Sequence, residues 1–429
     1  MVLESLNQTT STLPSPANPS DFDCDIAIVG GGIAGATLAC ALKESGLKVV
    51  IIEIQPKAVA AAKRQAYAIS LLSERIFEGI GVWDKIQPEI ATFDKISLSD
   101  ADHQGVVHFQ PADLGTKALG YVGEHRLLLT ALQQFLDDCP NISWLCPAEV
   151  VGVEYPGTGA KIEVKVEGEM RQLRSRLLVA ADGARSQIRH GAGIKTRGWQ
   201  YWQSCVTAVI ETEKPHNNTA FERFWYSGPM GVLPLSENRC QVVWTAPHAE
   251  AKALRDLDEK QFLELLEYRT GGLLGRLKLM GQRFVFPVQL MQSDRYTLPG
   301  LALIGDAAHC CHPVGGQGLN MGIRDAAALA QVLQEADQQG EDISSLNVLR
   351  RYEGWRKREN FTILGFTDLL DRMFSNSWLP VIIVRRSGLW MLRRIPLVKF
   401  YALQLMTGLR GRLPQLAHSK VQSSIKTQT

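Results

Sequence analysis

The sequence predicts an α/β protein with an antiparallel sheet inserted in the middle of the chain and a helical region at its C-terminal end. Three observations lead to this prediction. A strand, a glycine-rich turn, a helix and a second strand follow one another between residues 25 and 53; short aromatic and β-branched runs alternate with turn residues between 198 and 286; and apolar residues recur at helical spacing after residue 319. The chain has 429 residues, of which 45% are hydrophobic, so it can form a large core and more than one domain.

Composition narrows the class of protein. A net charge of +2 gives no indication of a nucleic-acid partner. The eight cysteines form neither a CxxC pair nor a His/Cys metal spacing, so we expect reduced thiols, no metal site and a cytoplasmic location. Cys310-Cys311 fits two small loop residues better than a redox pair, because adjacent cysteines seldom form unstrained disulfides. Residues 1–21 lack the apolar segment of a secretory signal and predict a disordered tail, and no apolar run is long enough to span a membrane.

The first motif predicts a dinucleotide site. The apolar strand Asp25–Val29 runs into Gly30-Gly31-Gly32-Ile33-Ala34-Gly35, which has the GxGxxG spacing, and a helical pattern follows. Gly30 would make the turn, Gly32 would admit a pyrophosphate, and Gly35 would let the helix pack on the strand. A second strand ends at Glu53, where a carboxylate would accept hydrogen bonds from ribose hydroxyls. The pattern alone does not distinguish NAD from FAD.

Two further strands end at an acidic residue beside a glycine. The apolar run Leu177–Ala181 stops at Asp182-Gly183, which fits either a second cofactor contact or an ordinary turn. The run Leu301–Ile304 stops at Gly305-Asp306, and a loop with Pro313, Gly315, Gly316 and Gly318 follows. We expect a helix to begin near Leu319 or Asn320 and to direct its N–H groups and positive dipole end at whatever fills the loop.

Together, these motifs resemble those of the group A flavoprotein monooxygenases, which have the p-hydroxybenzoate hydroxylase fold. The motifs are Gly30-x-Gly32-x-x-Gly35, then Ala181-Asp182-Gly183-x-x-Ser186, then Gly305-Asp306-Ala307-Ala308-His309 with Pro313, Gly315, Gln317-Gly318, Asn320, Gly322 and Asp325. Within that group the chain is most similar to the ubiquinone-biosynthesis hydroxylases, on pieces such as Ala68-Ile69-Ser70 and Gly81-Val82-Trp83. The resemblance extends from about Asp25 to Pro414.

The resemblance implies a Rossmann-like FAD-binding domain, an inserted antiparallel-sheet substrate domain and a C-terminal helical region. It implies that Glu53 and the glycine turn hold FAD, that Asp306 holds the ribityl chain, and that the loop from Pro313 to Asn320 faces the isoalloxazine ring of the flavin. It also implies that Asp182-Gly183 serves both FAD and NAD(P)H. The predicted cofactor-binding residues are Gly30, Gly32, Ile33, Ala34, Gly35, Glu53, Arg64, Arg126, Asp182, Gly183, Asp306, Pro313, Gly315, Gly318, Leu319 and Asn320. The expected segments are a tail (1–22), the FAD-binding domain (23–92, 118–196 and 288–345), the substrate domain (93–117 and 197–287) and the helical region (346–429).

The implied activity is an NAD(P)H-driven hydroxylation of the ring of a prenylated phenol by dioxygen, in quinone biosynthesis. The sequence leaves two alternatives open: a flavin-dependent reductase of a prenyl lipid, and a non-catalytic flavin protein of a quinone-pathway enzyme complex. No general base is identified, because His309 and His312 fit structural roles better. Four side chains of the inserted sheet are candidates for lining the substrate pocket, although core positions suit each of them individually: Trp225, Tyr226, Met230 and Trp244.

The C-terminal region is basic and rich in apolar residues. After Asp371 the sequence contains no Asp or Glu, and aromatic and aliphatic runs lie between the basic residues Arg372, Arg385, Arg386, Arg393, Arg394, Lys399, Arg410, Arg412, Lys420 and Lys426. This composition favours peripheral contact with an anionic membrane surface, where each basic residue contributes about 1 kcal/mol. A basic helical cap packed on the FAD domain is the alternative interpretation.

Overall fold

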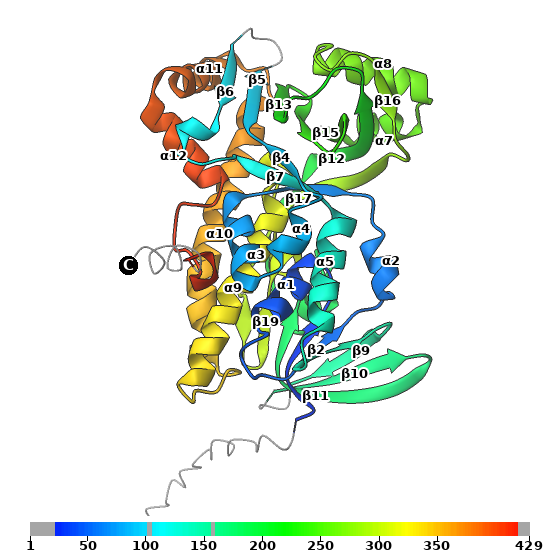
Figure 1. The fold of residues 1–429 in the computed structure, drawn as a ribbon, viewed down its shortest axis with the longest axis vertical. Helices are drawn as coiled ribbons and strands as arrows, with labels where there is room; N and C mark the ends of the chain where they lie inside the picture. The colour runs from blue at the N-terminus through cyan, green and yellow to red at the C-terminus, as the bar shows by residue number, and fades with distance from the viewer. Residues whose placement is uncertain (1–21, 101–104, 156–158, 419–429) are drawn as a thin grey trace, which may run out of the picture.

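The computed structural model describes residues 22–100, 105–155 and 159–418. The predicted tail of residues 1–22 therefore lies almost entirely outside the described part, as do Lys420 and Lys426. The first sheet is parallel along β19, β11, β1, β2 and β8, and antiparallel hairpins extend it (Figure 1). Its strands are β18 (Thr297–Leu298), β19 (Leu301–Leu303), β11 (Glu169–Ala180), β1 (Cys24–Val29), β2 (Val49–Ile52), β8 (Ile142–Leu145), β9 (Glu149–Glu154) and β10 (Ala160–Val166).

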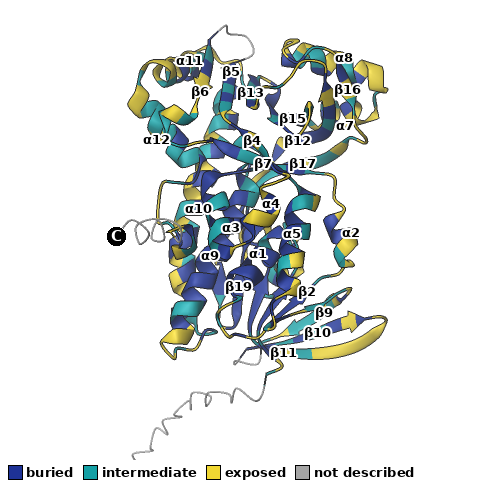
Figure 2. Ribbon diagram, in the orientation of Figure 1, coloured by how far each residue is buried: buried dark blue, intermediate teal, exposed yellow. Residues whose placement is uncertain are grey.

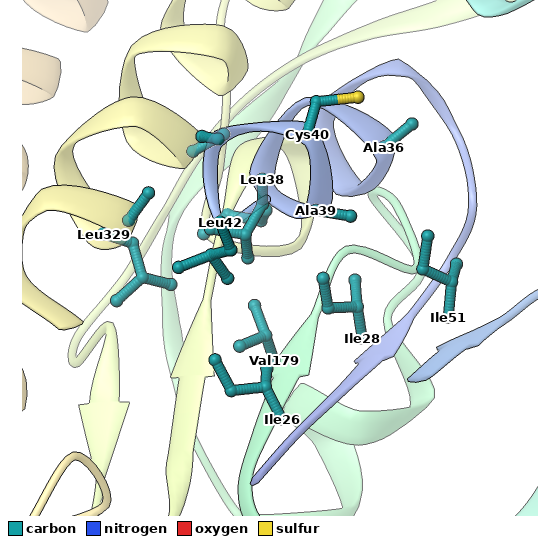
Figure 3. Packing of buried hydrophobic residues seen from close by; sticks show 14 of the residues in the cluster. Ile26, Ile28, Ala36, Leu38, Ala39, Cys40, Leu42, Ile51, Val179 and Leu329 are labelled. Atoms are coloured by element: carbon teal, nitrogen blue, oxygen red, sulfur yellow. The ribbon is translucent and has the colours of Figure 1, made fainter. Parts of the chain in front are cut away.

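Apolar packing between this sheet and its helices forms the largest core. Ile26 and Ile28 of β1 are fully buried beneath Leu38 of α1, and Leu329 of α9 packs beside them (Figure 3). The strands consist of nearly continuous apolar runs because helices or other chain segments cover both of their faces. The helices of this part are α1 (Ile33–Ala41), α2 (Lys57–Ala61), α3 (Leu71–Ile80), α4 (Trp83–Ile86), α5 (His125–Asp137), α6 (Gln187–Gly191) and α9 (Gln317–Gln338). The short 3-10 helices are η2 (Pro111–Asp113), η3 (Gly305–Ala307), η4 (Val314–Gly316) and η5 (Gln415–His418).

The second sheet is the predicted antiparallel one, and it is larger than the sequence indicated. Its order is β20 (His309–Cys310), β17 (Phe284–Ser293), β12 (Thr196–Thr212), β15 (Arg239–Pro247), β14 (Gly228–Pro234), β13 (Thr219–Trp225), β5 (Lys95–Asp100) and β6 (Val106–Phe109), with β16 (Leu277–Leu279) beside β12. All its pairings are antiparallel except that of β13 with β5. Helices α7 (His248–Asp256) and α8 (Glu259–Thr270) cover one face. A small sheet, β3 (Ala66–Ile69), β7 (Gly120–Glu124) and β4 (Ala91–Phe93), lies between the two larger ones (Figure 1).

The C-terminal region is helical, as predicted. Helix α10 (Leu346–Phe374) runs along the first sheet's helical layer and reaches the second sheet, where α11 (Leu379–Arg394) and α12 (Pro396–Met406) follow (Figure 1). Gly388 does not interrupt α11, whereas Pro396 begins α12, where a missing backbone N–H costs nothing. Among the described helices, none has the length and apolar content to cross a bilayer.

Candidate active site

The glycine turn between β1 and α1 requires glycine at two positions. Gly30 has a φ of 104°, and a Cβ there would lie 2.4 Å from the carbonyl oxygen of Ala181. A Cβ on Gly35 would lie 2.1 Å from the carbonyl oxygen of Gly30, so a side chain would separate the helix from the strand. At Gly32, by contrast, no atom lies within 4 Å of the Cβ position. The turn is therefore closed toward the protein and open toward a ligand, as a pyrophosphate site requires.

Glu53 lies beside this turn at the end of β2. Its Oε2 accepts a hydrogen bond of 2.7 Å from the backbone N–H of Gly31, and its Oε1 accepts one of 3.0 Å from the N–H of Gln55. These two bonds fix the carboxylate at the mouth of the turn. Each oxygen retains acceptor capacity for a further donor, such as a ribose hydroxyl.

A cavity of about 890 Å³ joins the first two motifs. Gly30, Gly32 and Glu53 line it from one side, and Asp182 and Gly183 from the other. The Oδ2 of Asp182 accepts a long 3.3 Å bond from the N–H of Ile188, whereas its Oδ1 is buried without a partner among the described residues. An unpaired buried acceptor costs free energy unless a ligand or water donates to it. The Asp182 position thus fits a cofactor contact better than an ordinary turn.

The other residues predicted to contact the cofactor near the glycine turn lie in different surroundings. Ile33 is buried in α1, and Ala34 packs against Gly305 and Gly322, so both fix the approach of α1 to the third motif. Arg64 and Arg126 are exposed, and neither lines this cavity or the second one described below. Their contact with a flavin stays a prediction.

The third motif brings the end of β19 to the start of α9. Asp306 follows β19 with an accessible carboxylate, and helix α9 begins at Gln317, two residues earlier than the earliest position expected. Gly316 precedes the helix, and no side chain caps it. The first N–H groups of α9, on Gln317, Gly318 and Leu319, therefore face the loop without an intrahelical acceptor, which suits a ligand that carries negative charge.

Asn320 positions this loop through its side chain. Its Oδ1 accepts bonds of 2.8 Å from both the N–H of Ser70 and the hydroxyl of Ser73. Its Nδ2 donates to the carbonyls of Ala68 at 2.8 Å and of Gly316 at 2.7 Å. All four hydrogen-bonding positions of the amide are thereby used within the protein. The predicted role of Asn320 at the cofactor accordingly depends on the backbone that this side chain holds in place.

Asp325, the last residue of the third motif, is a buried carboxylate behind the loop, and the sequence did not indicate its role. Asp325 accepts hydrogen bonds from the N–H of Gly305 at 3.1 Å, from His309 at 2.5 Å, and from two side chains of α10, Arg356 at 2.8 Å and Asn360 at 3.0 Å. Burial alone would raise the pKa of the Asp325 carboxyl, but His309 and Arg356 lower it to about 2. His309 is almost completely buried, and its bond to Asp325 joins it to this frame.

His312 is buried on the other side of the loop. Its Nδ1 accepts a 3.2 Å bond from the N–H of Val314, and its ring packs edge-on against Tyr201. Burial lowers the pKa of the imidazole to about 3, with Asp368 opposing the change, so His312 is neutral at physiological pH. It shapes the loop and carries no positive charge there.

A second cavity, of about 400 Å³, lies between the loop and the second sheet. Pro313, Gly315 and Asn320 line it, so it lies directly against the predicted flavin loop. The remaining walls are mainly apolar and come from the face of the second sheet and from α10, α11 and α12, with Ile96, Leu98, Phe224, Leu233, Phe366, Leu370, Met373, Leu389, Met391, Leu392, Val398 and Met406 among them. Such a cavity fits an apolar ring with an aliphatic substituent.

None of the pocket candidates Trp225, Tyr226, Met230 and Trp244 lines this cavity, and Met230 and Trp244 occupy the core positions that the sequence favoured. Met230 and Trp244 are buried under α7 and α8, on the opposite face of the sheet, and Tyr226 is 61% exposed. Neighbouring residues on a strand point to opposite faces, so Gly231 and Val243 line the cavity instead. Glu222 also lines it, and its carboxylate was missed because nothing in its local sequence marks a site.

Comparisons with known proteins agree with this geometry. Residues 23–358 match the family model described as FAD binding domain. The chain is 54% identical to an uncharacterized protein, slr1300, of Synechocystis sp. over 94% of this chain and 97% of that one. It is 36% identical to the ubiquinone hydroxylase UbiL of Rhodospirillum rubrum (92% and 94% of the two chains), and 34% identical to the 3-demethoxyubiquinol 3-hydroxylase of Escherichia coli (90% and 98%). The crystal structure of p-nitrophenol 4-monooxygenase from Pseudomonas putida shares the fold, with a TM-score of 0.77 at 20% identity over 90% of this chain and 98% of that one.

The residues of this structure fit FAD. The open position at Gly32 and the carboxylate of Glu53 suit the pyrophosphate and ribose of its adenosine half, and the unpaired Oδ1 of Asp182 suits a hydroxyl donor. The uncapped N-terminus of α9 suits the ring end, which gains negative charge on reduction. The match of the family model over most of the chain, together with these features, identifies the chain as a member of the FAD-binding domain family and an FAD-dependent monooxygenase.

Proposed function

We propose that this enzyme hydroxylates the aromatic ring of a prenylated phenol in quinone biosynthesis. One atom of dioxygen enters a ring C–H bond, the other leaves as water, and NAD(P)H supplies the two electrons. UbiL of Rhodospirillum rubrum and the 3-demethoxyubiquinol 3-hydroxylase of Escherichia coli, which match over nine-tenths of the chain, support a ubiquinone-type substrate.

The shape of the second cavity carries this proposal. It begins at the loop residues Gly315 and Gly316 and continues to α11, where Leu389 and Met391 line it, and to α12, where Val398 lines it. Met391 is also 40% exposed, so the cavity reaches the outer surface of α11. A phenol ring would lie against the loop while its prenyl chain would follow the apolar walls outward. Burying each CH₂ of that chain gains about 0.8 kcal/mol.

FAD supplies the redox and oxygen chemistry when it is bound, and the protein orients and stabilises the reactants. The N–H groups at the start of α9 and the helix dipole would stabilise negative charge at the loop. Asp325 connects Gly305 to α10, and Asn320 connects the loop to α3, so both fix the loop's position. The apolar walls exclude water from the reacting ring.

We further propose that the enzyme works at a membrane surface. Exposed residues occur along α11 and α12 (Figure 2), and the large apolar ones, counting Trp378 just before α11, are Trp378, Leu379, Ile383, Val384, Trp390, Met391, Leu397 and Tyr401. Arg393 and Arg394 are exposed beside them, and the described part of the chain carries no acidic residue after Asp371. An apolar patch with a basic border suits an anionic bilayer, from which a prenylated substrate could enter directly. Cytoplasmic location and assembly with other quinone-pathway enzymes stay predictions.

A labelled-oxygen experiment tests the function. FAD-loaded protein would be incubated with NAD(P)H, ¹⁸O-labelled dioxygen and a defined prenylphenol, and the products examined by mass spectrometry. We expect one labelled oxygen in the prenylated ring. Oxidation of NAD(P)H with a reduced but unlabelled lipid would instead support a prenyl-lipid reductase. A flavin that NAD(P)H does not reduce in the presence of the substrate would support a non-catalytic role.

A further inference from the structure

The second cavity contains a carboxylate without a cationic partner. Among its lining residues the ionisable side chains are Glu222 and Arg385. Arg385 is used within the protein, because it donates to Asp100 at 2.9 and 3.2 Å and to the carbonyl of Asn376 at 2.8 Å. Glu222 has no such counter-ion among the described residues. Placing a charged group in an apolar cavity costs free energy. An unpaired carboxylate there therefore indicates a ligand-binding position.

The sheet directs Glu222 toward the flavin loop. On β13, Glu222 pairs with Gly231 of β14 on one side and with Leu98 of β5 on the other. A Cβ at Gly231 would lie 3.4 Å from Oε2 of Glu222, so the carboxylate lies over Gly231, in space that the side chain of a larger residue would occupy. The backbone of Gly315 hydrogen-bonds to it from the loop. The carboxylate therefore lies at the inner end of the cavity, where the phenol ring would be held.

The groups around Glu222 do not neutralise it. On β12 the nearby titratable group is the buried thiol of Cys205, whose pKa burial raises to about 12, with Glu222 adding to the effect. On β5, Asp100 is bound to Arg385, and on α10, Asp371 bonds to Ser375. The α10 residues that line the cavity are apolar: Phe366, Leu370, Met373 and Phe374.

We propose that Glu222 binds the phenolic hydroxyl of the substrate and accepts its proton, an assignment that rests on the proposed function. In this step the O–H bond of the phenol breaks and a new O–H bond forms on the carboxylate. The electron pair stays on the phenolic oxygen and raises the electron density of the ring carbons ortho and para to it. The ring is thereby prepared for oxygen insertion, and the proton returns to the product's oxygen afterwards.

The ionisation of Glu222 suits this task. Burial raises the pKa of its carboxyl to about 7, and the bond from Gly315 opposes part of that effect. A general base is most effective when its pKa lies near the working pH. An ordinary glutamate would be a much weaker base toward a phenol, whose own pKa is about 10.

The test compares Glu222→Gln with Glu211→Gln, a substitution of an exposed glutamate on β12. Gln keeps an oxygen that can accept the bond from Gly315, so flavin content should be unchanged. We expect turnover of the prenylphenol to fall by about 10²- to 10⁴-fold in Glu222→Gln and to be unaffected in Glu211→Gln. The wild-type rate should rise with pH through about 7 as Glu222 ionises, and this step should be missing from the variant. A ring-fluorinated prenylphenol, whose hydroxyl is more acidic, should restore much of the variant's activity.

A binding measurement complements the rate. At pH 8, a prenylated nitrophenol would be titrated anaerobically into FAD-loaded protein by calorimetry in two buffers of different ionisation enthalpy. The wild-type protein should take up a proton when the ligand binds, because the bound phenolate and Glu222 then share one proton. Glu222→Gln should take up no proton. Equal turnover, pH profile and proton uptake in wild type and Glu222→Gln would overturn the role of Glu222 alone. Absence of ring hydroxylation by the wild-type enzyme would overturn the proposed function and this assignment with it.

Discussion

The Oδ1 of Asp325 lies 2.8 Å from Nε of Arg356, and both side chains are almost completely buried. This ion pair connects the start of α9 to α10, and Asp325 also accepts the N–H of Gly305 at the end of β19. Together with Asn320, this carboxylate therefore fixes the position of the loop that faces both the FAD site and the second cavity.

Asp325→Asn should reduce the free energy of unfolding by roughly 3–5 kcal/mol, because it removes the buried carboxylate from Arg356 and leaves it only the ion pair with the partly exposed Glu359. Asp137→Asn, which breaks an exposed pair with Lys57, should cost about 0–1 kcal/mol. Denaturant unfolding at pH 7 measures both. The folded pKa of Asp325 is lowered to about 2, so its contribution is present above the unfolded value near 3.8 and is lost as the pH falls toward 2. Equal stabilities of the two variants would contradict the assigned role.

Gly35→Ala should disrupt the first motif, because the added Cβ would lie 2.1 Å from the carbonyl oxygen of Gly30. We expect lower stability and a loss of bound flavin. Gly354→Ala is the matched control: this glycine lies inside α10 with no atom within 4 Å of its Cβ position, and alanine there should stabilise by about 0.5–1 kcal/mol. Thermal unfolding and flavin absorbance per protein check both variants. A Gly35→Ala protein with full flavin content would exclude the close packing described for the turn.

Asp306→Ala should purify with little bound FAD, because its accessible carboxylate is the predicted contact for the ribityl chain. Asp84→Ala, which removes an exposed carboxylate on α4, should retain the flavin. Flavin released by denaturation and measured by fluorescence gives the occupancy. If Asp306→Ala retains its full flavin content, the ribityl chain is held by other residues.

The sequence was most informative where a function occupies a short contiguous segment. The glycine turn at Gly30 and the strand end at Asp182 are such segments, and the structure brings both to one cavity. At the turn, phosphate binding requires particular residues at fixed spacing. The role proposed for Glu222 could not be predicted from a local motif. It depends on Gly231 and Gly315, which lie on another strand and in a loop and approach Glu222 only in the folded protein. The bond between Arg385 and Asp100 likewise joins residues 285 positions apart.

The pocket residues of the second sheet show a different limit of sequence analysis. Aromatic residues such as Trp244 suit both a core and a pocket, and only the strand's register decides which face they join. Trp244 faces α7 and α8, whereas its neighbour Val243 faces the cavity. A shift of the strand register by one residue would turn Trp244 toward the cavity and Val243 toward α7 and α8.

Glu222→Gln should raise thermal stability above neutral pH. The pKa of Glu222 is raised from 4.5 to about 7 on folding, so the folded protein binds more protons than the unfolded chain between these values. Its contribution to stability is therefore fully present below pH 4.5 and is lost as the pH rises through 7. The melting temperature of Glu222→Gln minus that of wild type should grow across this window and then level off. A difference that is independent of pH would contradict the raised pKa.

Membrane contact should depend on the exposed face of α11. Trp390 is 59% exposed and Ile383 is 58% exposed, so replacing either with Glu removes apolar contact and introduces a charge that an anionic bilayer repels. We expect each variant to float less with vesicles of mixed neutral and anionic lipid, while its turnover of a short-chain, water-soluble phenol stays near that of wild type. Tyr268→Glu is the control, because Tyr268 is 71% exposed but lies on α8, far from α11 and α12 (Figure 1). High salt should weaken wild-type binding, since Arg393 and Arg394 act through screened charge. Flotation that is equal in all three variants would exclude α11 as the contact surface and favour the interpretation of this region as a helical cap.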